Sequence, residues 1–532
     1  MVDGVSQWIL SLLIIFPLLV ALLIVIIPSN ADCRLHKNIA LVGTIIELIF
    51  SLHLIKYFVP NSAQFQFAQV LPWLPEVTGI KYIVGVDGLN LILVLLSTVF
   101  SVIVMLTTYS SIKTKIKGFL ALFLLLESAI IGVFVSLDVV LFYVFWELTL
   151  IPVYFMLGIW GGKNRVYATI KLFVYGVIGS LLMLVALIYL YYTHSIHNGG
   201  VYSSNLLDLY RTAAALPFAT QAWLFLAVTL AFGIKVPIFP FYTWLPDTYE
   251  QAPATYTLLS GVILKLAAYG LIRFSVCLFP AAATYFAKPI MVLALIGIIY
   301  GALIAWQQTN VRRIMAFSSL SHLGFIVIGI FSLNTIGLQG ALYQMINHAV
   351  TAGALFILFN FLYERRGSFE LDDFGGLAKV LPWYGFFFVI AAMGSVALPS
   401  TGSFIGEWLI LIGAFQAQPV IGSLATLGVI FGAVYILLAT YRIIFGPLNK
   451  EENKHIQGLN RNEVIQLSIL SVLIFVLGFA SSPILQHTKP TLINIEKSVN
   501  TNSPYMSELA NIHDGFLYPL NKFPSDSHEG VK

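Results

Sequence analysis

The chain has 532 residues, of which 59% are hydrophobic and only 10% are charged; its net charge is +4 and its mean hydropathy is +0.90. A soluble globular chain carries roughly 25% charged residues, so this composition cannot cover a water-exposed surface and calls for lipid as the solvent. The small net charge, with basic residues scattered in loops between apolar runs, argues against a nucleic-acid partner.

Motifs for cofactors and metals are absent from the sequence. Cys33 and Cys277 are the only cysteines, and they are too isolated for an iron–sulfur cluster or a structural zinc site. Neither the dinucleotide-binding nor the P-loop glycine pattern occurs. We therefore predict no cofactor and no metal on this chain, and we expect any redox or hydrolytic chemistry on another chain.

Apolar runs of about 20 residues, the length that spans a bilayer, recur along the whole chain. The sequence predicts an all-α polytopic membrane protein with about fourteen transmembrane helices, at 8–27, 39–58, 86–109, 118–136, 138–160, 168–192, 221–243, 253–277, 288–308, 312–332, 338–363, 382–416 (interrupted), 420–445 and 464–484. Segments 60–85 and 194–219 are predicted outside the membrane, with a short surface helix. The polar tail from about 488 is predicted to be loosely ordered.

The distribution of lysine and arginine predicts the orientation in the membrane. With the N-terminus outside, seventeen basic residues fall in inside-facing loops and helix ends. Four fall in outside-facing loops, at Lys81, Arg211, Arg273 and Lys288, and four more in the C-terminal tail. The bias predicts a multi-pass membrane protein with both termini on the outer side of the membrane.

Helices 4–8 and 9–13 form two sets of five. Because five is odd, consecutive sets cross the membrane in opposite senses, which is the inverted-repeat arrangement of many transporters. The predicted units are three N-terminal helices, the first repeat, the inverted second repeat, a C-terminal helix and a polar tail, at 1–117, 118–277, 278–445, 446–487 and 488–532.

One helix in each set is broken. Two prolines interrupt the first in Lys235-Val-Pro-Ile-Phe-Pro240, and Leu398-Pro-Ser-Thr-Gly-Ser403 interrupts the second. Proline removes a backbone donor, and the freed carbonyl groups need water or polar partners, so such breaks occur where a cavity is lined. Both breaks adjoin a charge, Lys235 in one and Glu407 in the other.

Ionisable side chains lie inside several predicted spans, where each costs about 2.5–3.5 kcal/mol on insertion scales. The six strongest candidates for an ion path, in chain order, are Glu147, Lys235, Lys265, His322, His348 and Glu407. Pairing with a carboxylate keeps a buried lysine charged, whereas an unpaired one tends to release its proton. Making and breaking a Glu147–Lys235 pair would therefore switch Lys235 between holding its proton and passing it on. Histidines, which titrate near neutral pH, would carry the proton onward.

Other polar residues have competing interpretations. The buried charges as a set could be structural pairs that only fix the register of the helices. Glu127 and Lys171 are equally consistent with a proton path and with a structural role. For Asp247 and Glu250, a proton entry and a solvated turn are equally consistent with the sequence. For Glu47 and Lys56, the favoured interpretation is a position at a helix end or in a contact with a partner. His194 and His197 have metal-ligand spacing, but a solvated loop is favoured.

Four motifs resemble the antiporter-like membrane subunits of respiratory complex I, nearly along the whole chain and in the same order. They are Trp146-Glu-Leu-Thr-Leu-Ile-Pro-Val-Tyr154, Lys235-Val-Pro-Ile-Phe-Pro240 with Trp244-Leu-Pro-Asp247, Ser318-Ser-Leu-Ser-His-Leu-Gly-Phe325, and Leu398-Pro-Ser-Thr-Gly-Ser-Phe-Ile-Gly-Glu407. The first motif and the acidic Glu407 favour the M-type branch, since L- and N-type chains are expected to carry lysine there.

The resemblance implies a proton-translocating subunit of a bacterial inner membrane, with no redox centre of its own. The outer side, where both termini are expected, would then be the periplasmic side. Glu147, Lys235, Lys265 and Glu407 match the central charged residues of the family's proton path, and His322 and His348 match its connecting histidines. NADH, FMN, iron–sulfur clusters and quinone are expected on partner subunits, among them two other antiporter-like chains. The sequence departs from the family pattern at Tyr249, where histidine is usual, and at Ser400, where glycine is usual.

Three alternatives remain open. The chain could belong to a multi-chain cation/proton antiporter or to a proton-pumping membrane hydrogenase, since their membrane chains resemble it closely. It could also be a membrane scaffold that conducts no ions, in which case replacing Lys235 or Glu147 by alanine would leave pumping intact.

Overall fold

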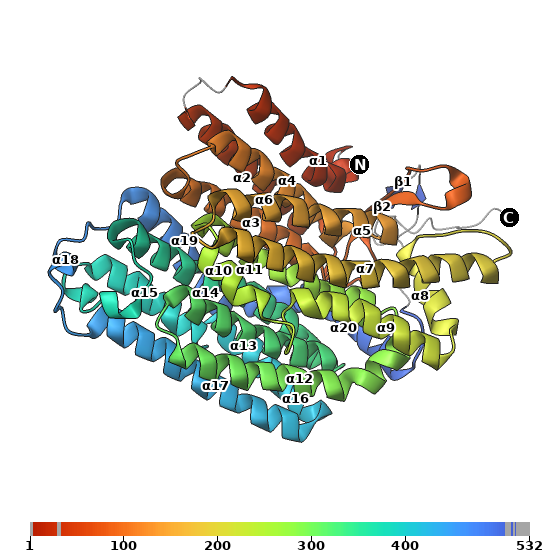
Figure 1. Cartoon of the computed structure of the whole chain (residues 1–532). Helices are drawn as coiled ribbons and strands as arrows, with labels where there is room; N and C mark the ends of the chain where they lie inside the picture. The colour runs from red at the N-terminus through yellow and green to blue at the C-terminus, as the bar shows by residue number, and fades with distance from the viewer. Residues whose placement is uncertain (1–3, 29–32, 506–511, 514–515, 518–532) are drawn as a thin grey trace, which may run out of the picture.

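A computed structural model describes residues 4–28, 33–505, 512–513 and 516–517, and these residues are mostly helical. Long helices lie side by side in one bundle, with the N-terminal helices along one side of it (Figure 1). The first half of the chain forms α1 Gly4–Ile26, α2 Cys33–Tyr57, β1 Gln66–Pro72, η1 Glu76–Thr78, β2 Lys81–Val86, α3 Leu91–Ser111, α4 Ile116–Val135, α5 Val139–Leu148, α6 Leu150–Trp160, α7 Arg165–His197, α8 Leu206–Ala215, α9 Phe218–Lys235, α10 Trp244–Gln251, α11 Ala254–Gly270 and η2 Leu271–Val276.

The second half continues the same bundle. Two of its helices, α13 and α14, are buried by the helices around them over their whole apolar windows. The elements are α12 Pro280–Gln307, α13 Val311–Phe331, α14 Thr335–Arg366, η3 Leu371–Asp373, η4 Leu377–Lys379, α15 Pro382–Ser395, α16 Gly402–Ala417, α17 Pro419–Thr440, η5 Tyr441–Phe445, α18 Glu451–Lys454, α19 Arg461–Phe479, α20 Ser481–Asn500, β3 Ile512–His513 and β4 Phe516–Leu517.

Several helices begin or end at residues with recognisable capping chemistry. Asp138 caps α5 by accepting from the backbone N–H groups of Val140 and Leu141. Asn460 and Glu463 form a reciprocal capping box at the start of α19. At the other end of a helix, Gly367 takes a left-handed φ of 72° just after α14, a conformation that glycine adopts without a steric penalty.

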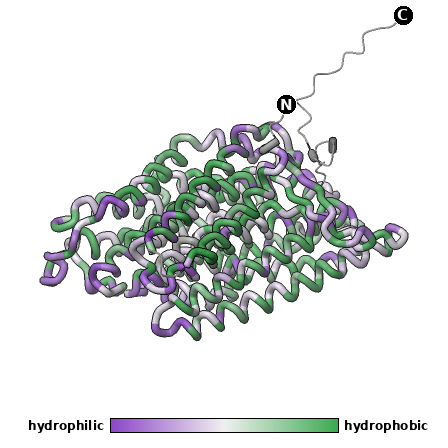
Figure 2. The backbone as a smooth tube through the Cα atoms, turned by 90° about the horizontal axis from the view of Figure 1, so that it is seen from above, coloured by the Kyte–Doolittle hydropathy of each residue, from purple (hydrophilic) through white to green (hydrophobic). Residues whose placement is uncertain are grey.

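The apolar helices agree with a polytopic membrane protein. In the part of the chain that the structure describes, twelve helices are long and apolar enough to cross a bilayer. The predicted interrupted span 382–416 appears as two shorter apolar helices, α15 and α16. Hydrophobic residues run along the helices, and hydrophilic stretches gather mostly where the helices end (Figure 2).

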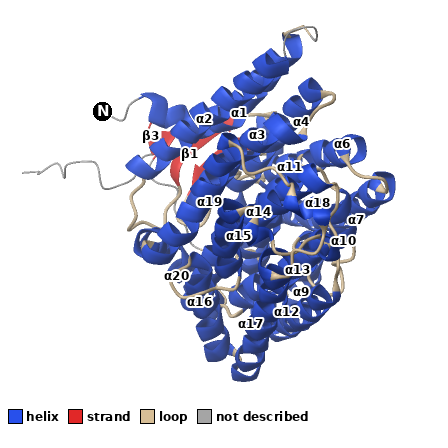
Figure 3. Cartoon of the chain, turned by 90° about the vertical axis from the view of Figure 1, so that its left-hand side faces the viewer, coloured by secondary structure: helices blue, strands red, loops and turns tan. Residues whose placement is uncertain are grey.

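The predicted extramembrane segments contain more structure than a surface helix. Within 60–85, β1 and β2 pair antiparallel, and the only helical piece described there is the three-residue η1. The short β3 and β4 extend this sheet in the order β2-β1-β4-β3, beside the N-terminal helices (Figure 3). The segment 194–219 does contain the expected helix, α8.

Two predictions near the helix ends were wrong. The tail does not become irregular at 488, because α20 continues to Asn500 and packs against α12 and α14. Its polar sequence is amphipathic, with Leu492 and Ile495 buried. His194 is not in a solvated loop either, since α7 extends to His197 and the buried His194 ring bonds Thr212 Oγ1 at 2.7 Å.

Candidate functional site

Lys265 and His348 meet in the interior of the helix bundle. Lys265 lies on α11 and His348 on α14, and both side chains are buried. Lys265 Nζ lies 2.6 Å from His348 Nδ1, so the ammonium group can donate a hydrogen bond to the ring. A lysine from the first predicted repeat therefore directly contacts a histidine from the second.

His322 and Glu407 form the next contact. His322 on α13 lies with its Nδ1 3.0 Å from Glu407 Oε1 on α16, and both residues are buried. Gln344 on α14 donates from Nε2 to the same carboxylate oxygen, also at 3.0 Å. Two donors thus hold the Glu407 carboxyl in a fixed orientation within the apolar core.

The two pairs lie next to each other. The rings of His322 and His348 are 5.5 Å apart between centroids and tilted by 51°. Among the hydrogen bonds of the described residues, none joins the two rings directly. Lys265, His348, His322 and Glu407 therefore form a row of adjacent titratable groups, which we call the central row.

Glu147 and Lys235 lie around a small cavity between α5, α6, α7 and α9. Its volume is about 40 Å³, enough for roughly one or two water molecules, and its lining includes Trp146 and Thr149. Lys235 donates to Thr149 Oγ1 at 3.0 Å, and its Nζ lies 3.8 Å from the centre of the Trp146 ring. None of the ion pairs in the described part of the chain joins Lys235 to Glu147.

Both predicted helix breaks are present and both adjoin a charge. Helix α9 ends at Lys235, and the indole N–H of Trp244 donates to the carbonyl of Ile234, one residue before that helix end. The second break separates α15 from α16, the helix that carries Glu407. Within it, Ser400 has a φ of 91°, in the region that favours the glycine usual in the resembling family.

Comparisons with known proteins identify the family. A family model described as NADH:quinone oxidoreductase/Mrp antiporter, TM matches residues 136–432, which include all six predicted path residues. The NADH-quinone oxidoreductase subunit M of Rickettsia prowazekii (strain Madrid E) is 37% identical over 481 residues, covering 90% of this chain and 96% of the relative. The chain belongs to the subunit M family.

Solved structures share the fold of this subunit M family member. A chain of respiratory complex I from Thermus thermophilus with bound NADH aligns with a TM-score of 0.82 at 28% identity, over 92% of this chain and 99% of that one. A chain of the Mrp complex from Dietzia sp. DQ12-45-1b aligns with a TM-score of 0.79 at 18% identity, over 94% and 99%, which is a likeness of fold. The family and the M-type branch predicted from the motifs are confirmed.

A surface ion cluster lies where α7, α10 and α13 come together. Lys171 pairs with Asp247 at 2.7 Å, and Arg313 lies 3.0 Å from Glu250 and 3.7 Å from Asp247. These four side chains are partly exposed. They are bound to one another, so neither Lys171 nor Asp247 is a free charge in this structure.

A buried ion pair between η2 and the residues just before α3 was not predicted from the sequence. Arg273, assigned to an outside-facing loop, is fully buried in η2 and lies 2.5 Å from Asp87 Oδ2, which is also fully buried. The rings of Phe65, Tyr269 and Tyr505 surround the guanidinium group at 4.9–5.9 Å. The apolar run 268–279 around this arginine was the signal that it lies inside the protein rather than in a loop.

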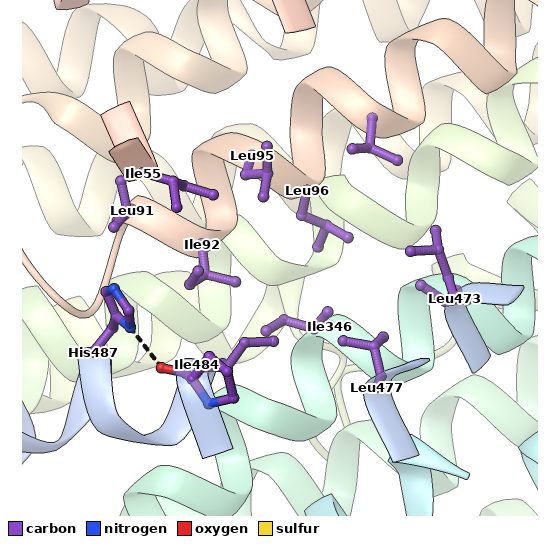
Figure 4. A pocket seen from close by; sticks show the side chains of 13 residues that line it. Ile55, Leu91, Ile92, Leu95, Leu96, Ile346, Leu473, Leu477, Ile484 and His487 are labelled. Carbon is purple, nitrogen blue, oxygen red and sulfur yellow. Dashed lines mark hydrogen bonds between the residues drawn. The ribbon is translucent and has the colours of Figure 1, made fainter. Parts of the chain in front are cut away.

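An apolar cavity of about 230 Å³ lies away from the buried charges, between α2, α3, α14, α19 and α20. Leucine, isoleucine and valine side chains line most of it (Figure 4). His487, at its edge, donates from Nδ1 to the Pro483 carbonyl at 2.6 Å. Because its lining holds no carboxylate, lysine or arginine, this cavity cannot take part in a row of charged groups.

Proposed function

We propose that the central row carries protons within a membrane subunit of NADH-quinone oxidoreductase. The chain is a proton-pumping member of the subunit M family of complex I, and the residues that move the proton are the proposed part. The observation that carries the proposal is the close succession of Lys265, His348, His322 and Glu407 in a buried part of the bundle. A structural ion pair would need two of these groups, not four.

In this proposal each group receives a proton from the one before it. Lys265 Nζ gives a proton to His348 Nδ1, His348 passes one to His322, and His322 Nδ1 gives one to Glu407 Oε1. Each donor is left one proton short and is refilled from the preceding group. Glu407 is the exit-side carrier, and its oxygen stays in place because Gln344 also donates to it.

Glu147 and Lys235 act as the control element on the other side of Lys265. Lys235 contacts the Trp146 ring and donates a hydrogen bond to Thr149, while Glu147 lines the same small cavity. This arrangement, with Lys235 and Glu147 unpaired, is the separated state of the switch. Movement of Lys235 toward Glu147 would stabilise its charge, and movement away would favour transfer of its proton toward Lys265. A water molecule in the cavity can bridge the two.

The proposal extends to the architecture. We propose fourteen spans, with α11–η2 as one span and α15–α16 as the interrupted one, in two inverted five-helix repeats. The unit boundaries remain those predicted from the sequence, except that α20 extends the ordered C-terminal part to Asn500. Both termini face the periplasm, and NADH, FMN, iron–sulfur clusters and quinone stay on partner subunits, including the two other antiporter-like chains.

Cation/proton antiport is the second candidate function, and the Dietzia Mrp fold is the observation that favours it. Family relatives at 34–37% identity are named as NADH-quinone oxidoreductase subunits, which favours complex I. Copurification with flavin- and iron–sulfur-containing subunits would support the complex I assignment.

The direct test replaces Lys265 by alanine in reconstituted complex I. We expect assembly and NADH oxidation in the presence of uncoupler to persist while proton pumping falls by at least about tenfold, since one station of the row is lost. The matched control is Lys288→Ala, which removes an exposed lysine from α12. Pumping at the wild-type rate in the Lys265→Ala complex would refute the proposed path.

A further inference from the structure

Two glutamates lie buried together in the N-terminal helices, away from the central row. Glu47 on α2 is 0% exposed and Glu127 on α4 is 1% exposed. Glu47 lies ten residues before the end of its helix and Glu127 eight, which places them about 15 Å and 12 Å from those ends at 1.5 Å per residue. Both carboxyl groups are therefore deep within the apolar part of the bundle. Of the two interpretations offered for Glu47, a helix end or a partner contact, the helix end is wrong.

The two carboxyl groups are close enough to interact electrostatically, since α2 packs against α4 and the charge of one group opposes ionisation of the other. The buried Ser101 hydroxyl on α3 is the neighbouring group that favours the charged form of Glu127, and no cation is paired with either glutamate among the described residues. All four carboxyl oxygens are buried, and none accepts a hydrogen bond from the described donors that meets ordinary geometry. Buried polar atoms are normally hydrogen-bonded, and a proton carried by one of the two groups would satisfy this requirement.

In the part of the chain that the structure describes, no basic side chain bonds a carboxyl oxygen of Glu47 or Glu127. Helices α1 and α3 contain no lysine, arginine, aspartate or glutamate over their described spans. On α2, Lys37 donates to the carbonyl groups of Tyr109 and Ile112, ten residues from Glu47. On α4, Lys117 donates to the carbonyl of Ile27, ten residues from Glu127. Lys265 of α11, which also packs against α4, is engaged by His348.

Two adjacent carboxylates in an apolar interior cannot both stay ionised, because each penalises the charge of the other and burial penalises both. We propose that Glu47 and Glu127 form a second proton-binding site, which holds at least one proton between them at neutral pH. A proton shared by the two groups supplies the missing hydrogen bond and removes at least one buried charge.

This site is separate from the proposed proton path. Glu47 and Glu127 both lie outside residues 136–432, the segment matched by the family model. The two helices that carry them belong to the part of the bundle formed by α1–α4 (Figure 1). The proposed proton site therefore does not depend on the role proposed for the central row, and each can be tested without the other.

Infrared spectroscopy of purified complex I tests the proposal, because a protonated carboxyl has a carbonyl stretch distinct from that of a carboxylate. We expect the difference spectrum of wild type minus the Glu47→Gln/Glu127→Gln double variant at neutral pH to show at least one protonated carboxyl band that shifts in D₂O. The control is Glu76→Gln, which removes an exposed glutamate from η1 and should leave this band unchanged.

The single variants keep the test decisive if the double variant does not assemble. In the wild type, ionisation of one glutamate opposes ionisation of the other, so the last protonated band should persist to a higher pH. In Glu47→Gln and in Glu127→Gln, we expect the band to disappear at a pH lower by about one unit or more. Absence of the band in the wild type, its appearance only after Na⁺ is removed, or equal midpoints in wild type and single variants would overturn the proposal.

Discussion

The buried ion pair of Asp87 and Arg273 shows how single charges are accommodated in this interior. Arg273 Nε and Nη1 find no hydrogen-bond partner among the described residues, so Asp87 provides the only ion pair to this buried guanidinium there. Removing one partner of such a pair leaves an uncompensated charge, which costs about 3–5 kcal/mol, whereas replacing both by apolar residues is often neutral.

We therefore expect Asp87→Asn to destabilise the protein by about 3–5 kcal/mol. The double variant Asp87→Asn/Arg273→Met should recover most of that loss, because no charge then remains buried. The measurement is the midpoint of thermal unfolding of the purified complex in detergent. An Asp87→Asn midpoint equal to that of the wild type would show that the pair contributes little.

Individual site residues were predictable from the sequence to different degrees. A charge inside an apolar run is visible without any structure, and Glu147, Lys235, Lys265, His322, His348 and Glu407 were found in that way. Gln344 was not, because a neutral amide inside an apolar helix gives no signal until its neighbour is known. The pairing of Glu47 with Glu127 was equally hidden, since eighty residues separate them in the chain.

At the scale of elements, Asp138 joins three parts of the chain. Its Oδ1 accepts from the first turn of α5, and its Oδ2 accepts from the Lys81 N–H of β2 at 3.2 Å and from Ser204 Oγ, just before α8. Burial raises the pKa of the Asp138 carboxyl above its usual value, although these hydrogen bonds act in the opposite direction. The residue is at once a helix cap and an anchor for the hairpin.

Replacing Asp138 by alanine should cost about 0.5–2 kcal/mol of stability, the usual range for a lost N-cap. Because the pKa is raised in the folded state, the contribution of this carboxyl is full below its ordinary pKa and declines as the pH rises through the raised value. Thermal unfolding of wild type and Asp138→Ala across a pH series measures both effects. A gap that widens with rising pH would contradict the direction assigned here.

The elements themselves followed the sequence where apolar length and helix breakers decide, and departed from it where tertiary contacts decide. The proline-containing breaks after Lys235 and after Leu398 were predicted from their residues alone. The continuation into α20 was not, since its helix depends on packing against α12 and α14 rather than on uninterrupted hydrophobicity. The β1–β2 hairpin also escaped prediction, because its two strands lie in one short segment between the apolar helices α2 and α3.

At the scale of the whole molecule, the central row makes a prediction about additivity. If Lys265 and Glu407 are successive proton carriers of one path, removing either side chain blocks the same proton transfer. We expect Lys265→Ala/Glu407→Gln to pump no more slowly than the worse of the two single variants, measured as protons moved per NADH oxidised. Effects that multiply would instead indicate two independent paths.

The separation between the two histidine rings has a consequence for the cell as a whole. A membrane that stores a proton gradient would be discharged by a subunit with an unbroken chain of hydrogen bonds through it. The centroids of the His322 and His348 rings are 5.5 Å apart, and no hydrogen bond among the described residues joins them, which would interrupt such a chain at rest. If the central row carries protons as proposed, passage waits for an imidazole to turn, and the geometry that allows transport would also limit leakage through the membrane.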